Sequence, residues 1–410
     1  MQMTRRTLLG SALAAGALPV AARAATGKAI RLGVLTDLSG PYRDTAGPGS
    51  VAGAKQAAAE AMAAFPGLHV EVVQADHRNK PDIGAGIARE WFDRGGVDAI
   101  IDVPNSGVGL AIAEVAREKD KVFLITGAGS TALTGKHCAP TSVQWTFDTY
   151  MLARSNGGAL VRAGRKKWYF ITADYAFGHA LQRDATTFIE KEGGKVVGSA
   201  AYPFPATTDF SALLLQAGAS GADVVAFANA GANTISCIKQ AHEFGLVKKN
   251  ISLAALLMFI SDVHSLGLET AQGLTVTSTF YWDLNDRTRA FTRRVRARMP
   301  ADWRPDMEHA GSYAAPLHYL KAVHDMGVAQ AKKSGAAAVA RMKAMPTDDD
   351  AFGKGRIRED GRKLQPAYLF QVKSPQESKG SWDLYKLIAT TSAEDAARPL
   401  AEGGCSFIHA

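Results

Sequence analysis

The chain has 410 residues, of which 47% are hydrophobic and 21% are charged, and its formal net charge is +8. This composition is typical of a globular protein with a sizeable core, so it excludes an intrinsically disordered chain and a polytopic membrane protein. Without its first 24 residues the chain keeps 386 residues and a net charge of +5, which is too mild and too dispersed for nucleic-acid binding. The densest basic run, residues 287–298, is interpreted as the solvated face of a helix. A chain of this length is too long to fold around a single hydrophobic core, so we expect two domains.

Residues 1–24 have the features of an export signal. Arg5 and Arg6 precede an apolar run over residues 8–22, and Ala22-Arg23-Ala24 forms a small-residue cleavage motif. Paired arginines before two leucines indicate the twin-arginine route. The alternative is a membrane anchor, but a spanning helix needs about 20 apolar residues. No cysteine follows the cleavage motif to carry a lipid, so we expect an exported protein that is free in its compartment.

From residue 30 onwards, short β-branched or aromatic runs alternate with alanine-rich helical stretches, as in a doubly wound α/β sheet. In the first half we expect strands over residues 30–35, 69–74, 99–103 and 122–126, and helices over 50–64, 81–94 and 108–119. In the second half we expect helices over 150–163, 177–192, 210–218 and 233–244, and strands over 168–172, 195–198, 224–228 and 274–278. Two open α/β lobes are the simplest account of this repeated pattern.

In sheets of this kind a ligand lies beyond the carboxyl ends of the strands, and two loops of the first half occupy such places. The first contains Asn105 and Ser106 and leads directly into a helix, whose N-terminal N–H groups can hold a carboxylate; a plain N-cap is an equally good interpretation. The second is residues 127–131, where small residues let the backbone approach an anion. This loop also fits the GxGxxA pattern of dinucleotide sites. Because Gly135 and Pro140 stop any long phosphate-binding helix, we expect no nucleotide cofactor.

The loops after the later strands carry aromatic rings and amides. The candidate ligand contacts among them are Tyr175, Phe177, Asn229, Asn233, Tyr281, Trp282 and Asp283. Rings near strand ends often belong only to the core or to a lobe interface. On the edges of a cleft between lobes, however, they suit an apolar or aromatic ligand. Tyr150 and Phe259 complete the set of candidate contacts.

Three cysteines in an exported protein favour one disulfide and one odd thiol. Cys237 lies in a stretch with helical apolar spacing and is expected to be buried. Cys138 and Cys405 lie in loop-like contexts with glycine or proline nearby, so we expect these two to be bonded; three free thiols are the alternative. The spacings match no zinc site, and no metal is expected.

Four segments carry a joint pattern: IRLGVLTDLSGP at 30–41, ITGAGSTALT at 125–134, DYAFG at 174–178 and IKQAHEFGL at 238–246. Together they resemble the periplasmic binding proteins of ABC importers, in the branch of the leucine/isoleucine/valine-binding proteins, over essentially the whole chain after the export signal. The resemblance implies a type I periplasmic binding fold, with two doubly wound parallel-sheet lobes joined by a three-crossover hinge. It implies a first lobe of residues 27–146 and 277–350, a second lobe of 147–276 and 355–395, and a C-terminal tail of 396–410.

The resemblance also implies how a ligand is held. Two first-lobe loops bind its carboxylate, and in this chain the loops correspond to Asn105, Ser106, Ala128, Gly129 and Ser130. An aromatic side chain of the second lobe closes over the ligand, and it corresponds to Tyr175 or Phe177. Amino-acid binders of this branch usually add an acid from a second-lobe loop, which binds the ligand's ammonium group. Residues 256–261, which correspond to that loop, contain no acid. The ammonium group of an amino acid would therefore lack a partner here unless Asp262 or Asp283 substitutes.

An unpaired buried ammonium costs on the order of several kcal/mol. We therefore expect a carboxylate without an amine, aromatic carboxylates included. Branched-chain or other amino acids, amides or urea-like solutes and short alcohol-derived metabolites are the alternatives.

The expected function is that of a monomeric receptor that delivers a small organic solute to an inner-membrane ABC permease and its ATPase, without a cofactor. An exported enzyme is the main alternative, because folded cofactor enzymes use the twin-arginine route. Its support is weak, since the sequence contains no GxSxG, HExxH, CxxC or complete GxGxxG motif. A sensory module that binds the same ligand is a third possibility, and the sequence does not separate it from transport.

Overall fold

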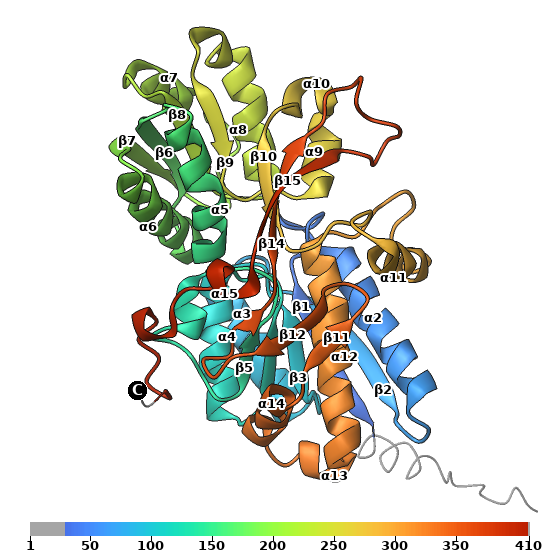
Figure 1. Ribbon diagram of the computed structural model, residues 1–410. Helices are drawn as coiled ribbons and strands as arrows, with labels where there is room; N and C mark the ends of the chain where they lie inside the picture. Colours follow the sequence, from blue (N-terminus) through green and yellow to red (C-terminus); the bar gives the residue numbers. More distant parts are fainter. Residues whose placement is uncertain (1–28, 409–410) are drawn as a thin grey trace, which may run out of the picture.

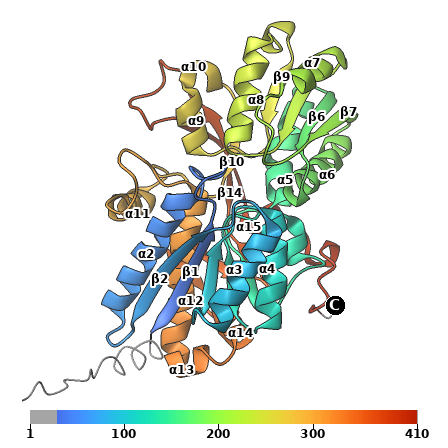
Figure 2. The same cartoon turned by 180° about the vertical axis from the view of Figure 1, so that it is seen from behind.

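The computed structural model describes residues 29–408. The chain forms two α/β lobes, one above the other in Figure 1, and each is built on a parallel sheet with helices on both faces. The predicted fold class is confirmed. Figure 2 shows from behind that the chain passes between the lobes in a narrow waist, where β10 and β14 lie close together.

The first lobe contains a five-stranded parallel sheet with the order β2-β1-β3-β4-β5. Its strands are β1 (Ile30–Thr36), β2 (Val70–Asp76), β3 (Ala99–Asp102), β4 (Val122–Ile125) and β5 (Ser142–Gln144). Successive side chains of a strand point to opposite faces, so Ile101 and Leu124 pack on one face while Ile100 and Phe123 pack on the other. The first face is covered by α2 (Gly47–Ala64), α12 (Met307–Met326) and α14 (Gly335–Ala344), and the second by α3 (Pro81–Asp93) and α4 (Ser106–Glu118).

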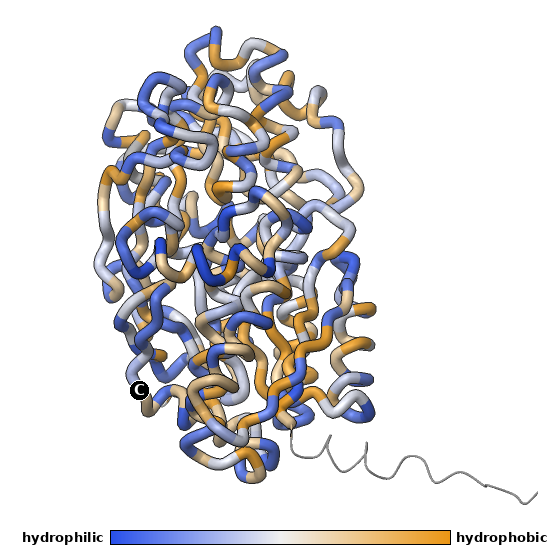
Figure 3. The backbone as a smooth tube through the Cα atoms, turned by 90° about the vertical axis from the view of Figure 1, so that its right-hand side faces the viewer, coloured by the Kyte–Doolittle hydropathy of each residue, from blue (hydrophilic) through white to orange (hydrophobic). Residues whose placement is uncertain are grey.

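The second lobe follows the same plan around a four-stranded parallel sheet with the order β7-β6-β8-β9. Its strands are β6 (Lys167–Ala173), β7 (Lys195–Tyr202), β8 (Val224–Ala228) and β9 (Ser252–Ala255). Trp168 and Phe170 pack against α5 (Thr149–Arg162) and α6 (Ala176–Lys191), whereas Tyr169 and Ile171 pack against α7 (Ser211–Ala219) and α8 (Ala232–Glu243). Both faces of β8 are buried, which explains its uninterrupted apolar sequence. Figure 3 shows hydrophobic and hydrophilic stretches alternating along the backbone tube in both lobes.

The last third of the chain adds two antiparallel sheets. One consists of β10 (Thr275–Ser278), β14 (Ala367–Val372) and β15 (Tyr385–Thr391); the other consists of β11 (Thr347–Asp349), β12 (Gly353–Ile357) and β13 (Lys363–Leu364). The shorter helices are α9 (Ile260–Leu266), α10 (Leu268–Ala271), α11 (Asp286–Arg296), α13 (Val328–Ala331), α15 (Ala393–Ala396), η1 (Thr131–Thr134), η2 (Val247–Lys249) and η3 (Leu400–Glu402).

These two small sheets pack on different lobes. Val276, Phe370 and Tyr385 belong to the same buried cluster as α8, so β10, β14 and β15 lie with the second lobe. Arg362, by contrast, is buried against β5, where its guanidinium donates to the carbonyl of Gln144 (3.1 Å) and pairs with Asp148 (2.8 Å). Residues 353–364 therefore lie with the first lobe, although the sequence assigned 355–364 to the second.

The elements predicted between residues 30 and 278 are all present, with ends that differ by a few residues. The helix expected from Ser50 begins at Gly47, and the strand expected over 195–198 continues to Tyr202. The basic run forms α11, but its arginines are paired with acids as well as solvated: Arg287 contacts Asp348 (2.8 Å) and Arg294 contacts Glu60 (2.8 Å). Within residues 29–408, no helix is long and apolar enough to cross a membrane. The predicted export signal lies outside the described residues.

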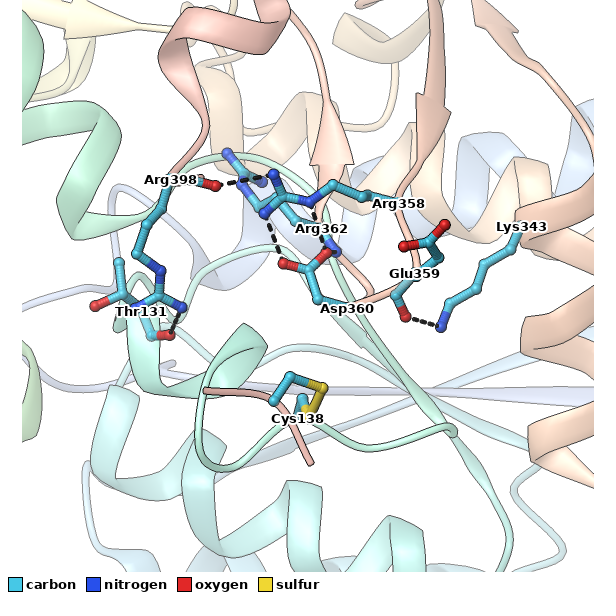
Figure 4. The surroundings of a disulfide bond; sticks show 9 residues. Thr131, Cys138, Lys343, Arg358, Glu359, Asp360, Arg362 and Arg398 are labelled. Atoms are coloured by element: carbon cyan, nitrogen blue, oxygen red, sulfur yellow. Dashed lines mark hydrogen bonds and ion pairs between the residues drawn. A yellow bond between two sulfur atoms is a disulfide. The ribbon is translucent and has the colours of Figure 1, made fainter. Parts of the chain in front are cut away.

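The C-terminal tail after β15 returns to the first lobe and is fixed there by a disulfide (Figure 4). The sulfur atoms of Cys138 and Cys405 lie 2.01 Å apart, which is the pairing favoured by the sequence, and Cys237 is free and buried in α8. Arg398 of the tail donates to the carbonyl of Thr131 (3.0 Å), and its own carbonyl accepts from Arg358 (2.8 Å). The tail therefore contacts η1, directly after the loop of residues 127–130.

Candidate ligand-binding site between the lobes

A small cavity of about 10 Å³, here called the interlobe cavity, lies where the two lobes face each other, and it has room for about one water molecule. Its first-lobe wall consists of Tyr42, Pro104, Gly127 and Glu308, and its second-lobe wall consists of Tyr175, Phe177, Ala230, Leu257 and Phe259. Pro104 and Gly127 follow β3 and β4, while Tyr175, Ala230 and Leu257 follow β6, β8 and β9. The cavity thus lies at the carboxyl ends of the strands of both sheets, where ligands of open α/β sheets bind.

Aromatic side chains close the cavity on one side and join the lobes. The hydroxyl oxygens of Tyr42 and Tyr175 lie 2.5 Å apart, and Phe204 stacks on Tyr175 with ring centroids 4.5 Å apart. Burial raises the pKa of both tyrosines, so both hydroxyls are protonated at neutral pH. The backbone N–H of Ala232 also donates to the carbonyl of Pro41 (3.1 Å). The lobes are therefore in direct contact across the cavity.

The loop of residues 127–130 has its carbonyl groups turned into the first lobe. The Gln144 amide donates to the carbonyl of Ala128 (2.9 Å), and the Thr149 N–H donates to the carbonyl of Gly129 (2.8 Å). Within the described residues, the N–H groups of Ala128 and Gly129 donate no hydrogen bond. Since the N–H of Gly129 shares a peptide plane with the Ala128 carbonyl, it points the opposite way, away from Gln144. This loop therefore offers unpaired backbone donors beside the cavity.

The polar side chains of the two predicted first-lobe loops hold the loops in place and do not line the cavity. Asn105 is the N-cap of α4 and accepts from the Val108 N–H (3.1 Å). The Ser106 hydroxyl accepts from the Ser130 N–H (3.1 Å), and the Ser130 hydroxyl accepts from the Ala132 N–H (3.3 Å) at the start of η1. Only a short 3₁₀ turn follows the glycine-rich loop, so it lacks the long helix of a dinucleotide site.

The other predicted site residues divide into two groups. Tyr175, Phe177 and Phe259 line the interlobe cavity, and Tyr281 lines a neighbouring cavity that shares Phe259 as a wall. The remaining residues have partners elsewhere: Asn229 accepts from Thr234, Asn233 accepts from Tyr202, Tyr150 packs on Phe188, Trp282 donates to the Trp382 carbonyl, and Asp283 pairs with Arg289.

Asp262 and Asp283, the two acids that the sequence left open as substitutes for the usual ammonium-binding acid, do not line the interlobe cavity. Asp283 is tied to Arg289 at 2.9 Å. Asp262 is buried in α9 and accepts from the Phe259 N–H (2.9 Å), and burial raises its pKa to about 7. The acid that lines the cavity is Glu308, which the sequence analysis did not single out.

The position of Glu308 is set by the start of α12. Asp306 is the N-cap of this helix and accepts from the N–H groups of Glu308 (2.9 Å) and His309 (3.1 Å). Gly49 in α2 has no side chain, and a Cβ there would lie 2.2 Å from the His309 ring, so α2 and α12 can pack closely at this end. Close packing holds the first turn of α12 against the cavity.

Two further features surround Glu308. Asp102 at the end of β3 is fully buried, its Oδ2 has no hydrogen-bond partner among the described residues, and burial raises its pKa to about 7. Asp102 and Val103 also have φ angles of 83° and 63°, which are costly for residues with a side chain and often mark functional sites.

Among the described residues, no group of three or more histidine, cysteine, aspartate or glutamate side chains is arranged to hold a metal ion.

Two open α/β lobes that enclose a cavity at the carboxyl ends of their strands define the class of two-lobed solute-binding proteins. The chain belongs to the periplasmic binding protein family, whose model matches residues 29–380. It is thus a substrate-binding protein of the kind that serves ABC transporters, as the sequence resemblance implied.

Solved structures agree with this assignment. A periplasmic binding protein from Burkholderia mallei is 42% identical, with a TM-score of 0.88, and the match covers 93% of this chain and 99% of that one. A branched chain amino acid ABC transporter periplasmic ligand-binding protein from Burkholderia xenovorans is 38% identical, with a TM-score of 0.79 and coverage of 92% and 99%. A solute binding protein from R. palustris in complex with benzoate is 21% identical and shares the fold (TM-score 0.77, coverage 89% and 96%). The comparison with curated proteins gives no match.

Proposed function

We propose that this protein is a monomeric periplasmic receptor that captures a small organic carboxylate in the interlobe cavity and delivers it to an ABC permease and its ATPase. The observation that carries the proposal is the interlobe cavity itself, which both lobes line at the ends of their strands. Binding and release need no bond chemistry, so no enzymatic activity is proposed. Export through the twin-arginine route, directed by residues 1–24, would place the receptor in the periplasm, where it can reach an inner-membrane permease.

We propose that the ligand's carboxylate binds to the unpaired N–H groups of the loop of residues 127–130. Backbone donors suit an anion without bringing in a full positive charge. Tyr175, Phe177 and Phe259 provide an apolar wall for the rest of the molecule. The R. palustris protein in complex with benzoate shares only the fold with this chain, and its ligand supports an aromatic carboxylate to that extent. The Burkholderia xenovorans relative, by its description, supports a branched-chain amino acid.

We further propose that the lobes rotate as units about three crossover segments, at residues 146–149, 278–280 and 365–367. At each of these places the chain leaves elements of one lobe and enters elements of the other. The contact between Tyr42 and Tyr175 would then form when the lobes close and break when they open.

The test is a binding screen with the mature protein against amino acids, aromatic and aliphatic carboxylates, dicarboxylates, amides and polyols. A ligand that binds only the folded state stabilises it by RT ln(1 + [L]/Kd), about 2.7 kcal/mol at 100 times Kd, so thermal unfolding identifies the ligand class. Calorimetry then measures the affinity. Absence of stabilisation by every class would contradict the receptor function.

A pair of variants tests whether the interlobe cavity is the site. Tyr175→Ala should weaken binding of the best ligand by roughly 1.5–3 kcal/mol, the value of one buried aromatic side chain. Tyr150→Ala is the control, because Tyr150 packs on Phe188 between α5 and α6, outside the cavity. Equal losses in both variants would place the site elsewhere.

A further inference from the structure

Glu308 is a buried acid without a partner. Its side chain lines the interlobe cavity, the residue is 2% exposed, and its Oε2 makes no hydrogen bond within the described residues. A carboxylate in such a position normally has a cation or several hydrogen-bond donors beside it, because an unpaired buried charge is strongly unfavourable. The missing partner indicates that something outside the chain completes this part of the site.

The groups that face Glu308 from the neighbouring elements are acidic or neutral. Asp102 comes from β3, Asp262 from α9 and Asp306 from the N-cap of α12, and all three act together with burial to raise the pKa of Glu308 well above its usual range. Asp102 and Asp306 each keep an oxygen that has no hydrogen-bond partner in residues 29–408. The hydroxyls of Tyr42 and Tyr175 are also nearby and are protonated.

The one basic residue beside this cluster, His309, does not neutralise it. Its Nδ1 accepts from the Asp306 N–H (3.2 Å), so its proton lies on Nε2, which donates to the carbonyl of Ala46 (3.1 Å). Burial lowers the pKa of His309 to about 3, so the ring is neutral. Glu308 at the cavity and the three acids that act on it thus have no positive side chain among them.

We propose that Glu308 binds a cationic nitrogen of the ligand, so that the solute is an amino acid rather than a simple carboxylate. This inference rests on the proposed function and adds the ligand's charge to it. The ammonium would give Glu308 a partner and favour its ionised form, whereas a second anion at this end would disfavour that form. Gly127, the first residue of the loop proposed for the carboxylate, lines the same small cavity as Glu308, so the two proposed subsites border one space.

The placement differs from the arrangement that the sequence resemblance implied. There, the acid for the ammonium comes from a second-lobe loop, and its absence from residues 256–261 argued against an amine. Here the acid comes from the first turn of α12 in the first lobe. The absence of an acid in the second-lobe loop therefore no longer excludes an amino acid.

The experiment compares each amino acid with its deaminated analogue: L-leucine with 4-methylpentanoate, and L-phenylalanine with 3-phenylpropanoate. Calorimetry on the mature protein should show that at least one amino acid binds at least tenfold more tightly than its analogue. Glu308→Gln should reduce that preference at least tenfold. Glu60→Gln should keep it, because Glu60 is a first-lobe acid bound to Tyr313 and Arg294, outside the cavity.

A second measurement uses the wild-type protein, so it does not depend on how the variant folds. Binding of an ammonium requires ionised Glu308, whose pKa is raised in the free protein. Binding therefore releases a proton, and affinity increases as pH rises through the range in which free Glu308 is protonated; calorimetry in two buffers of different ionisation heat detects the proton. A neutral Glu308 that donates to a ligand carboxylate would give the opposite dependence, with affinity falling as pH rises.

Tighter binding of the deaminated acids, an unchanged preference in Glu308→Gln, or affinity that falls as pH rises would overturn the proposal while leaving the receptor function intact. If neither an amino acid nor a carboxylate binds, the proposed function fails together with the inference.

Discussion

The N-cap of α12 shows how one residue serves both stability and the site. Asp306 holds the first turn of the helix through one oxygen, while its second oxygen is buried without a partner in the part of the chain that the structure describes. Burial and the neighbouring acids Asp262 and Asp102 raise the pKa of Asp306 well above its usual range. Its capping hydrogen bonds need an acceptor, but not a charge.

This separation gives a prediction for two variants. Asp306→Asn keeps an acceptor oxygen and should change the free energy of unfolding by less than about 1 kcal/mol, whereas Asp306→Ala should lose about 0.5–2 kcal/mol with the cap. Urea unfolding at neutral pH measures both values. A loss as large for asparagine as for alanine would mean that the charge, and not the cap, stabilises this helix.

At the same scale, the sequence predicted part of the site. The loops after β3 and β4 and the rings of Tyr175, Phe177 and Phe259 could be predicted because a strand followed by small, polar or aromatic residues marks a ligand-binding edge. Glu308 could not, because it follows no strand and lies about 200 residues after Asn105 in the chain. Its role arises only when α2 and α12 pack and bring it beside the other acids.

At the scale of elements, strong apolar periodicity predicted the long helices and strands, while short elements escaped. β5 (Ser142–Gln144) and β9 (Ser252–Ala255) contain few β-branched or aromatic residues, unlike the four-residue strands β3 and β4, and their pairing with β4 and β8 comes from the tertiary fold. Residues 355–364 were assigned to the second lobe by the sequence resemblance, but they lie with the first: Arg362 is held by Gln144 and Asp148, contacts that no local pattern reveals.

Packing between α3 and α4 offers a matched pair of variants. A Cβ on Gly84 would lie 2.4 Å from Val108, whereas a Cβ on Gly86, in the same helix, would meet nothing within 4 Å. We therefore expect Gly84→Ala to destabilise the protein by about 1–3 kcal/mol through overpacking. Gly86→Ala should stabilise it by roughly 0.5–1 kcal/mol through helix propensity.

Thermal and urea unfolding of the two variants measure the difference. If Gly84→Ala is as stable as Gly86→Ala, α3 and α4 do not pack as closely as described.

At the scale of the whole molecule, the pairing of Cys138 with Cys405 joins residues 267 positions apart. A cross-link over such a distance restricts the unfolded chain, so replacing both cysteines by serine should lower the free energy of unfolding by about 2–5 kcal/mol. Reducing agent should have a similar effect on the wild-type protein and little on the double variant. Cys237→Ala is the control and should remain sensitive to reduction, because Cys237 is a free thiol. Equal stability of the reduced and oxidised proteins would contradict this role.

The two-lobed architecture was evident from the sequence because its pattern of strands and helices occurs twice, once for each sheet. The lobe contact through Tyr42, Phe204 and Tyr175 was not, since it joins side chains from loops of different lobes. Local sequence therefore determined each lobe, whereas their fit depends on the assembled molecule.

The same disulfide closes a covalent ring that contains the entire second-lobe sheet, from β6 to β9, and all three proposed crossover segments. A protease that cuts a single exposed loop anywhere between residues 138 and 405 would therefore leave one covalently connected molecule. The two pieces could separate only after the Cys138–Cys405 bond was reduced. A nicked receptor would keep both halves of its ligand site on one particle, and cleavage would be visible on a reducing gel alone.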